Sequence, residues 1–179
     1  MPTDYKKLLE DEPIPQELNI PSSDEDLYGD IHTEQEAVET FISFRLDTEW
    51  YAIRILKVRE VIRIKQITAL PSVPPHIIGL INLRGNILSV TDPKQLFGLA
   101  SSSIREENWI IVIEEDNVQI GIIVDELGDL VVIPINSLEP PLATLEARKM
   151  SYIEHIYWRG KQLVAIVHVE KLFMWKVNL

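Results

Sequence analysis

A pattern that occurs twice, 75 positions apart, limits the possible folds of this chain more than any other feature. The segment "INLRGNILSV" begins at Ile81 and "IYWRGKQLVA" begins at Ile156, and each places Arg-Gly between two apolar runs. A short segment that ends in Leu-Phe follows each of them, at 92–97 and at 169–173. A strand–turn–strand pattern precedes each, "FISFRLDTEWYAI" and "WIIVIEEDNVQIGI". The repeat predicts two small β units in tandem, each of about five strands that can curl into a barrel and remove exposed edges.

The register of the two Arg-Gly hairpins has two solutions. A two-residue loop places Ile81 opposite Leu88 and Ile156 opposite Leu163, so that apolar side chains meet in both hairpins. It requires a positive φ at the arginine, a conformation that usually selects Asn or Asp. A three-residue loop avoids this conformation but places Ile156 opposite Gln162. We favour the two-residue loop.

Other segments also indicate a mainly β protein with few short helices. The run "VREVIRI" alternates as a half-buried strand does, and prolines at 71, 74 and 75 exclude a central strand there. The run "DPKQLFGL" predicts a short helix that starts at Pro93 and stops near Gly98. Few segments have a strong period of 3.6 residues, so strands should dominate.

Charge divides the chain near residue 40. Residues 1–40 contain twelve Asp/Glu and two Lys, a net charge of −10, whereas residues 41–179 contain sixteen Asp/Glu and fifteen Lys/Arg, a net charge of −1. Residues 1–36 are also poor in apolar side chains and cannot offset the entropy cost of ordering. We expect an acidic, mostly disordered tail at 1–36 and a folded region at 37–179. Approximately 40–100 would form the first barrel and 105–175 the second, with an exchange of strands between them left open.

Composition argues against several classes of protein. Without cysteine, neither a disulfide framework nor a thiolate metal site can form. No run approaches the roughly 20 apolar residues of a membrane-spanning helix, and the first residues lack the apolar core of a secretory signal. We therefore expect a cytoplasmic protein with no direct membrane insertion. A nucleic-acid-binding small-barrel protein is the alternative from another class, but the balanced body lacks the basic surface that phosphates need.

The sequence offers little support for catalysis. It contains no HExxH, no CxxC, no histidine pair at ligand spacing and no glycine-rich phosphate loop. Asp92 and Asp125 could act as acid and base, but both lie at predicted strand ends, where a carboxylate usually caps a turn. We expect no enzyme activity, no metal and no cofactor.

Two charged residues suit a binding module better. Glu60 either faces water, as is usual in an alternating strand, or makes a polar contact beside an apolar patch of Val58, Val61 and Ile62. Arg84 is either a solvated turn tip or a ligand for a carboxylate, which fits its planar fork of five donors. Loops on rigid scaffolds often carry function, but the residues alone leave both alternatives open.

Several motifs occur together in the first half. They are V-x-E-V at 58–61, Leu-Pro with a prolyl loop at 70–75, N-L-R-G at 82–85, then Val90, Asp92 and Phe-Gly at 97–98. This combination resembles the CheW family, the coupling proteins of bacterial chemosensory arrays. The second-half run "IGIIVDELGDLVVIP" is similar to that family as well, so the resemblance covers about 41–175. Pro93 stands where the family commonly has an aliphatic residue.

The resemblance implies two packed five-stranded SH3-like barrels and a non-catalytic scaffold. Such adaptors join the cytoplasmic tip of a methyl-accepting chemoreceptor to the regulatory domain of a CheA-type histidine kinase, which has the same fold. One barrel would dock on its counterpart in the kinase, and a groove near the barrel junction would take the receptor's helical hairpin. Carried over to this chain, the partner-binding residues are Val58, Glu60, Val61, Ile62, Gly79, Asn82 and Arg84.

The resemblance also implies that Gly79 allows a close approach of neighbouring groups.

The same resemblance gives the cellular context. The protein would be recruited to receptor arrays at the inner membrane. The chain contains neither a receiver nor a kinase domain, which excludes CheV and CheA themselves. An adaptor of pilus-based motility or of another chemosensory-type pathway is the alternative within the family.

Overall fold

The computed structural model describes residues 36–100 and 103–174, so the predicted tail lies outside the described residues except for Glu36. Within them, strands dominate, every helix is short, and none is long and apolar enough to span a membrane. In chain order the elements are β1 (Val38–Leu46), β2 (Glu49–Arg54), η2 (Ile55–Lys57), β3 (Val58–Arg63), β4 (Ile77–Leu83), β5 (Asn86–Thr91), α1 (Pro93–Phe97), β6 (Trp109–Glu115), β7 (Val118–Val124), β8 (Glu126–Pro134), η3 (Ile135–Ser137), α2 (Ala147–Met150), β9 (Ile153–Arg159), β10 (Gln162–Val167) and α3 (Val169–Leu172).

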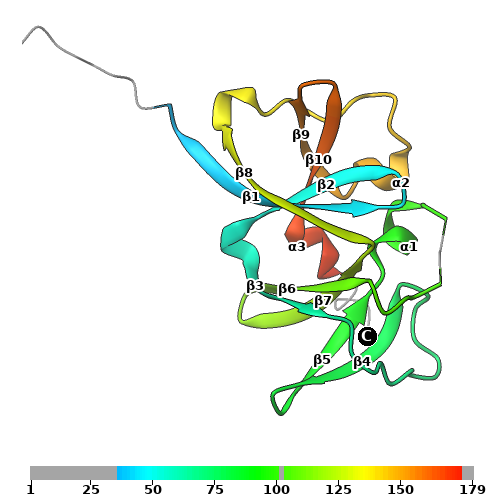
Figure 1. Ribbon diagram of the computed structural model, residues 1–179. Helices are drawn as coiled ribbons and strands as arrows, with labels where there is room; N and C mark the ends of the chain where they lie inside the picture. Colours follow the sequence, from blue (N-terminus) through cyan, green and yellow to red (C-terminus); the bar gives the residue numbers. More distant parts are fainter. Residues whose placement is uncertain (1–35, 101–102, 175–179) are drawn as a thin grey trace, which may run out of the picture. The chain divides into compact units, whose positions relative to one another are not determined.

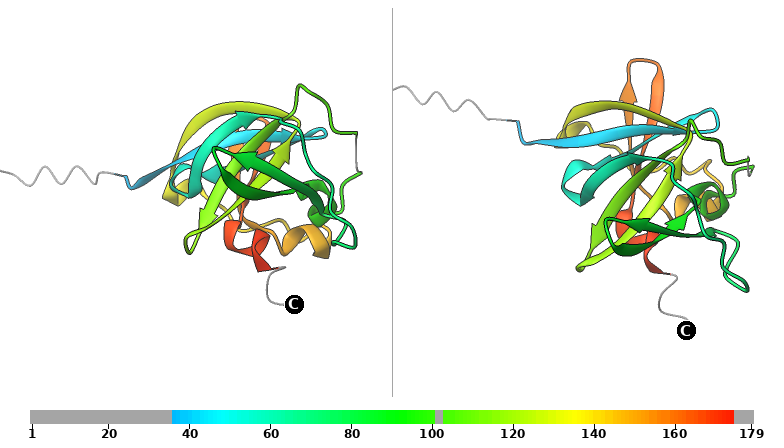
Figure 2. Two further views of the ribbon diagram at one scale, coloured as in Figure 1. Left: turned by 90° about the horizontal axis from the view of Figure 1, so that it is seen from below. Right: turned by 60° about the horizontal axis from the view of Figure 1, so that its bottom comes forward.

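The strands form two five-stranded sheets, and each sheet contains strands from both halves of the chain (Figure 1). Sheet A has the order β8-β1-β2-β10-β9, and sheet B has the order β3-β6-β7-β5-β4. Figure 2 shows β1, in blue, running beside β8, in yellow. The sequence prediction placed the barrels at approximately 40–100 and 105–175 and left an exchange of strands between them open. The observed sheets have such an exchange, because they combine β1 and β2 with β8–β10, and β3–β5 with β6 and β7.

The two sheets have the same plan. The β1–β2 hairpin in sheet A corresponds to the β6–β7 hairpin in sheet B, and each pairs in parallel with the other half's last strand, β10 or β5. An isolated bridge helps to close each sheet, Thr68 with Leu80 in sheet B and Glu139 with Ile156 in sheet A. Closure satisfies backbone groups that an open edge would expose. The predicted mainly β fold with two five-stranded units is confirmed.

The β4–β5 hairpin has the predicted register. Ile81 lies opposite Leu88, and Arg84 and Gly85 form a two-residue loop with φ angles of 53° and 90°. Asn82 stabilises this loop, because its Oδ1 accepts a hydrogen bond from the Gly85 N–H at 2.8 Å. That side-chain acceptor offsets the cost of a positive φ at an arginine.

The register predicted for the β9–β10 hairpin is wrong. Ile156 lies opposite Ala165 rather than opposite Leu163. The loop is again two residues long, but it consists of Gly160 and Lys161 instead of Arg-Gly. In the structure, the loop of the second hairpin therefore lies one residue further along the chain than the alignment of the two Arg-Gly pairs indicates.

The two loops also differ in the residue that has a positive φ. In β4, Asn82 precedes the last paired residue and supports the loop, whereas Trp158 stands at that place in β9, and an indole cannot accept a hydrogen bond. The positive φ of the second hairpin, 64°, is at Gly160, which has no Cβ to oppose it. Arg159 stays in the strand opposite Gln162, and its Nη2 donates to Gln162 Oε1 at 2.9 Å.

In the part of the chain that the structure describes, buried apolar side chains form three clusters. The largest lies between the sheets and includes Phe44 and Tyr51 of sheet A, Ile111 and Ile122 of sheet B, and Phe97 of α1. Helix α3, which lies between the sheets in Figure 1, adds further side chains to it. Two smaller clusters fill the insides of the two sheets. Burial of one such side chain contributes about 1.5–3 kcal/mol relative to exposure, so the inter-sheet cluster joins both barrels into one folded unit.

The predicted helix after β5 is confirmed. Pro93 begins α1, and the Asp92 carboxylate accepts a hydrogen bond from the Lys94 N–H at 2.9 Å as its N-cap. Gly98 ends the helix in the left-handed conformation, with φ 76°.

Candidate partner-binding site

Glu60 and Arg84 meet at one end of sheet B. Their elements, β3 and the β4–β5 loop, belong to opposite edges of the sheet, and its closure brings these edges together. Arg84 Nη2 donates to Glu60 Oε2 at 3.0 Å. The Arg84 side chain is nevertheless 78% exposed, so most of its five N–H donors stay available to another molecule.

A β-bulge sets the direction of Glu60. The register between β3 and β6 shifts between Val58 and Glu60. A bulge adds a residue to one strand and turns the side chains that follow it. Val58 and Val61 pack against the inter-sheet cluster, whereas Ile62 packs against the cluster inside sheet B. These three residues therefore do not form the single apolar patch that was one of the two alternatives for Glu60.

Gly79 and Asn82 shape the scaffold that carries Arg84. Gly79 is buried, and a Cβ at this position would lie 2.3 Å from the carbonyl oxygen of Thr68. Only glycine permits the close approach through which Thr68 and Leu80 exchange two backbone hydrogen bonds, of 2.8 and 2.9 Å. Asn82 holds the loop through its side chain, as described above.

A groove of about 470 Å³, here called the Arg84 groove, opens beside the ion pair. Two aliphatic side chains are exposed along it, Ile87 at 65% and Val118 at 39%. Its lining consists of Glu60, Leu83, Arg84, Asn86, Ile87, Leu88, Asn117, Val118 and Gln119. Exposed aliphatic side chains beside polar, hydrogen-bonding ones are common in protein–protein interfaces.

Sequence reasoning missed Ile87 and Val118 as site residues. Val118 directly follows the turn at Asp116 and Asn117, which have φ angles of 50° and 61°, and Ile87 is the second residue after the Arg84-Gly85 loop. Their proximity depends on the parallel pairing of β5 with β7, which places the two turns at the same end of the sheet. A signal was present, because an aliphatic residue next to a turn tip is hard to bury.

Sheet A has a pocket at the equivalent place, here called the Lys149 pocket, with a volume of about 330 Å³. Strand register gives the equivalence: Glu49 occupies the place of Val118, and Leu163 that of Ile87. The lining consists of Thr48, Glu49, Trp50, Leu145, Lys149, Ile156, Gln162, Leu163 and Ala165. Each barrel thus presents one hollow at the corresponding end.

The Lys149 pocket also contains an acid–base pair. Lys149 forms an ion pair with Glu49, and the Tyr51 hydroxyl donates to the same carboxylate oxygen at 2.5 Å. Burial raises the pKa of Glu49, but the hydrogen bonds from Lys149 and Tyr51 outweigh it and lower the pKa below its usual value. Burial and the nearby Glu49 raise the pKa of Tyr51. Glu49 is therefore a carboxylate and Tyr51 a neutral phenol at physiological pH.

A third surface, here called the aliphatic face, crosses the edge of sheet A. It consists of Val38, Leu56, Leu130 and Val132, which are 54%, 92%, 62% and 58% exposed. Val38 and Leu56 line one groove, and Leu130 lies opposite Ile42, a member of the inter-sheet cluster. Neighbouring exposed aliphatic side chains are costly in water and mark surfaces that bind a partner.

Asp92 and Asp125 have structural partners. Asp92 caps α1, and burial raises its pKa above the usual value. Asp125 Oδ1 accepts a hydrogen bond from Lys94 Nζ at 2.7 Å. Residues 36–100 and 103–174 contain no group of three or more His, Cys, Asp or Glu that could hold a metal ion.

Comparison with known proteins gives a consistent set of relatives. A family model described as CheW-like domain matches residues 40–176. The chain is 29% identical over 134 residues to the chemotaxis protein CheW of Klebsiella aerogenes, covering 75% of this chain and 81% of that one. It is 30% identical over 129 residues to CheW of Bacillus subtilis, covering 72% and 83%. It is 29% identical over 135 residues to the protein PilI of Pseudomonas aeruginosa, covering 74% and 76%.

A solved structure is also similar. The scaffolding protein TtCheW from Thermoanaerobacter tengcongensis has 32% sequence identity and a TM-score of 0.66. The similarity covers 73% of this chain and 89% of that chain. Both the order of motifs and the arrangement of strands therefore point to the same group of proteins.

Proposed function

Because this chain belongs to the CheW-like domain family, we propose that it is a non-catalytic adaptor that couples a chemoreceptor to a CheA-type histidine kinase. The observation that carries the proposal is the Arg84 groove, in which an exposed arginine with free donors lies beside two exposed aliphatic side chains. The adaptor works in the cytoplasm, where receptor arrays at the inner membrane recruit it.

The Arg84 groove takes the regulatory domain of the kinase. Interface energy is concentrated where an apolar anchor is surrounded by polar contacts, and Ile87 with Arg84 provides that combination. The partner surface must then offer an apolar side chain together with a carboxylate for the guanidinium. The Lys149 pocket, at the equivalent end of sheet A, gives the adaptor a second hollow of the same kind.

The aliphatic face takes the cytoplasmic tip of the receptor. A receptor tip is a helical hairpin, and an amphipathic helix binds through apolar side chains at i, i+3, i+4 and i+7 against an aliphatic surface. Leu130 and Val132 belong to sheet A, whereas the Arg84 groove belongs to sheet B. Both partners can therefore be bound at once, as an adaptor requires.

Two surface variants test this assignment. The affinities of the purified chain for the kinase regulatory domain and for a receptor cytoplasmic fragment are measured separately by calorimetry. Leu130→Asp should weaken receptor binding at least tenfold and leave kinase binding unchanged. Arg84→Glu should do the reverse. If both folded variants bind both partners like the wild type, these surfaces are not the binding sites.

An adaptor of pilus-based motility is the second candidate, favoured by the similarity to PilI. Its physical mechanism would be the same, and only the partners would differ. Co-purification of the tagged chain from its native cells, followed by identification of the captured kinase, distinguishes the two pathways. Capture of a kinase from a flagellar chemotaxis system supports the first candidate, and capture of one from a pilus system supports the second.

A further inference from the structure

Within residues 36–100 and 103–174, the chain passes between the sheets twice. Strands β1 and β2 belong to sheet A, β3 to β7 to sheet B, and β8 to β10 to sheet A again. The first crossing is η2, and the second is a single residue, Asp125, between β7 and β8. The orientation of one sheet relative to the other therefore depends on the inter-sheet cluster, on the contacts at these two crossings and on the contact between α1 and α2, where Arg148 donates a hydrogen bond to the Gln95 carbonyl.

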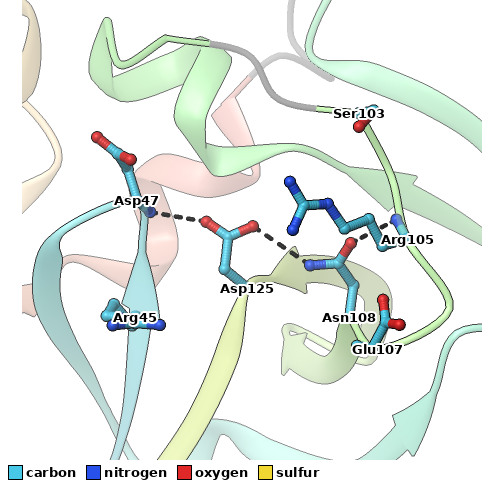
Figure 3. Close-up of a pocket in the computed structure, with 7 residues that line it drawn as sticks. All are labelled: Arg45, Asp47, Ser103, Arg105, Glu107, Asn108 and Asp125. Atoms are coloured by element: carbon cyan, nitrogen blue, oxygen red, sulfur yellow. Dashed lines mark hydrogen bonds between the residues drawn. The ribbon is translucent and has the colours of Figure 1, made fainter.

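Asp125 forms hydrogen bonds to both sheets. Towards sheet A, its Oδ2 accepts from the Asp47 N–H at 2.7 Å, and its own N–H donates to the Arg45 carbonyl at 3.0 Å. Towards sheet B, its Oδ1 accepts from Asn108 Nδ2 at 3.2 Å and from Lys94 Nζ at 2.7 Å. Figure 3 shows the carboxylate of Asp125 between Asp47 and Asn108. We call this set of contacts the Asp125 clamp.

The clamp depends on a charged carboxylate. Burial raises the pKa of Asp125, but the hydrogen bonds from Lys94, the Asp47 N–H and Asn108 lower it below its usual value. The side chain is 24% exposed and lines a pocket of about 380 Å³, so its oxygen atoms are partly shielded from water. Hydrogen bonds to a charged acceptor are stronger than those to a neutral one. An asparagine would keep the shape of Asp125, but its amide has only one acceptor oxygen and no charge, so it could not accept all of these hydrogen bonds.

Strand β6 connects the clamp to the first crossing. Asn108 directly precedes β6, and Glu115 is its last residue. Glu115 forms an ion pair with Lys57 of η2, and Lys57 also pairs with Glu170 of α3 at 2.9 Å. A strand of this length spans about 20 Å. Attachments at both ends of β6 oppose a rotation of the sheets about either end.

We infer that Asp125 is a positioning residue, whose clamp fixes sheet A against sheet B and so sets the orientation of the aliphatic face relative to the Arg84 groove. This inference rests on the proposed function, because that orientation matters only when both surfaces are occupied together. Loss of the clamp leaves each surface intact. The affinity for either partner alone is then unchanged, while the affinity for the second partner falls once the first is bound.

The orientation of the sheets can be measured without any partner. The chain contains no cysteine, so Lys161→Cys in sheet A and Asp116→Cys in sheet B, both at exposed turns, provide two specific sites for spin labels. Asp125→Asn should broaden the distribution of distances between the labels. An unchanged distribution would overturn the inference.

Two control variants separate positioning from a general loss of stability. Glu126→Gln makes the same change of charge at the next residue, whose partner, Arg45, belongs to the same sheet. Ile166→Val lowers stability inside sheet A without touching the clamp. Both should leave the distance distribution as in the wild type. If Asp125→Asn does not fold, Asn108→Ala, which removes only contacts towards sheet B, takes its place with the same expected broadening.

Binding measurements complete the test. For Asp125→Asn, the affinities for the kinase domain alone and the receptor fragment alone should equal those of the wild type. The affinity for the receptor fragment in the presence of saturating kinase domain should fall about tenfold, and an equal affinity would contradict the inference. If the wild type binds neither partner, the proposed function fails, while the spin-label result still decides whether the clamp orients the sheets.

Discussion

Arg84 and Glu60 form an ion pair of 3.0 Å where the two edges of sheet B come together. Glu60 lies in β3, at one edge of the sheet, and Arg84 follows β4, at the other edge. Barrel closure is therefore what creates the candidate site. An ion pair with such an exposed arginine contributes only about 0–1 kcal/mol to stability. The pair therefore contributes little to folding, and we expect its main role in binding a partner.

Charge reversal at this pair should separate binding from stability. Arg84→Glu alone should change the free energy of unfolding by about 0.5 kcal/mol or less, as expected for an exposed position, and Glu60→Lys, at a side chain that is 27% exposed, by about 1 kcal/mol or less. Each should weaken binding of the kinase regulatory domain at least tenfold. The double variant, Arg84→Glu with Glu60→Lys, should restore the ion pair but not the binding, because the partner's charged groups would face side chains of the wrong sign. Chemical denaturation and calorimetry measure the two effects.

Arg159→Glu is the matched control for the charge reversal. Arg159 belongs to the second Arg-Gly pair, but it lies in the strand opposite Gln162 and not at the tip. Its reversal should leave binding at the Arg84 groove unchanged. Wild-type affinity in the folded Arg84→Glu variant would remove Arg84 from the site.

Barrel closure itself depends on Gly79. Gly79→Ala should lower the free energy of unfolding by at least about 2 kcal/mol, because the new Cβ would overlap the Thr68 carbonyl and the φ of 154° is strained for any other residue. Gly85→Asn is the comparison: this position also has a positive φ, but a Cβ there meets nothing within 4 Å. It should cost less than about 1 kcal/mol, because asparagine is favoured in this turn. Urea denaturation of both variants measures the difference, and equal losses would show that the close approach is unimportant.

The sequence was sufficient for the fold class and for one hairpin. Alternation of apolar residues identified the strands, and the Arg84-Gly85 loop followed from the pairing of Ile81 with Leu88. The second hairpin was misread because its Arg-Gly suggested the same turn. The first loop has the Asn82 side chain as an acceptor, whereas the second loop lies one residue further along and has its positive φ at Gly160. The similarity between the two segments therefore does not extend to their turns.

The site could be predicted only in part, for a topological reason. Glu60 and Arg84 were selected through family motifs, but Ile87 and Val118 join them only because β5 and β7 pair in parallel. Alternation within one strand contains no information on which strands become neighbours. The same applies to Asp125, which was considered as an acid or base and whose contacts to both sheets follow from the exchange of strands.

The pH dependence of stability should reveal the contacts of Glu170. Burial raises the pKa of this carboxyl, but its own backbone N–H, Lys57 and His168 lower it to about 2 from its ordinary 4.5. A depressed pKa in the folded state stabilises the protein above about pH 4.5, and this contribution is lost as the pH falls towards 2. Because Glu170 is half exposed, we expect a contribution below about 1 kcal/mol.

Urea denaturation of the wild type and of Glu170→Gln at pH 7 and pH 3 measures that contribution. The variant should be less stable at pH 7, and the difference should shrink at pH 3. Glu106→Gln, a change at an exposed loop residue, is the control and should show no such difference. A difference between wild type and Glu170→Gln that does not depend on pH would contradict the assignment.

The buried Lys94 should be the most sensitive lysine of the chain's described part. Its side chain is only 5% exposed and its ammonium donates to Asp125 at 2.7 Å, so Lys94→Met leaves a largely buried carboxylate without its nearest cation. Loss of one partner of a fully buried pair costs about 3–5 kcal/mol. Because Asp125 is 24% exposed, we expect about 2 kcal/mol here. Lys161→Met, at an exposed turn, should cost less than about 0.5 kcal/mol.

At low pH, Lys94→Met should lower the free energy of unfolding by less than it does at pH 7. The pKa of Asp125 is lowered in the folded wild type, so the stabilisation by Lys94 is complete above the usual pKa of 3.8 and disappears as the pH falls below it. The two proteins should therefore differ most at pH 7 and progressively less towards pH 2 in urea denaturation. In an Asp125→Asn background, Lys94→Met should cost less than in the wild type, because the carboxylate to which Lys94 donates is gone and its weaker attraction to Asp92 remains. An undiminished cost in that background would show that Lys94 stabilises the fold through other contacts.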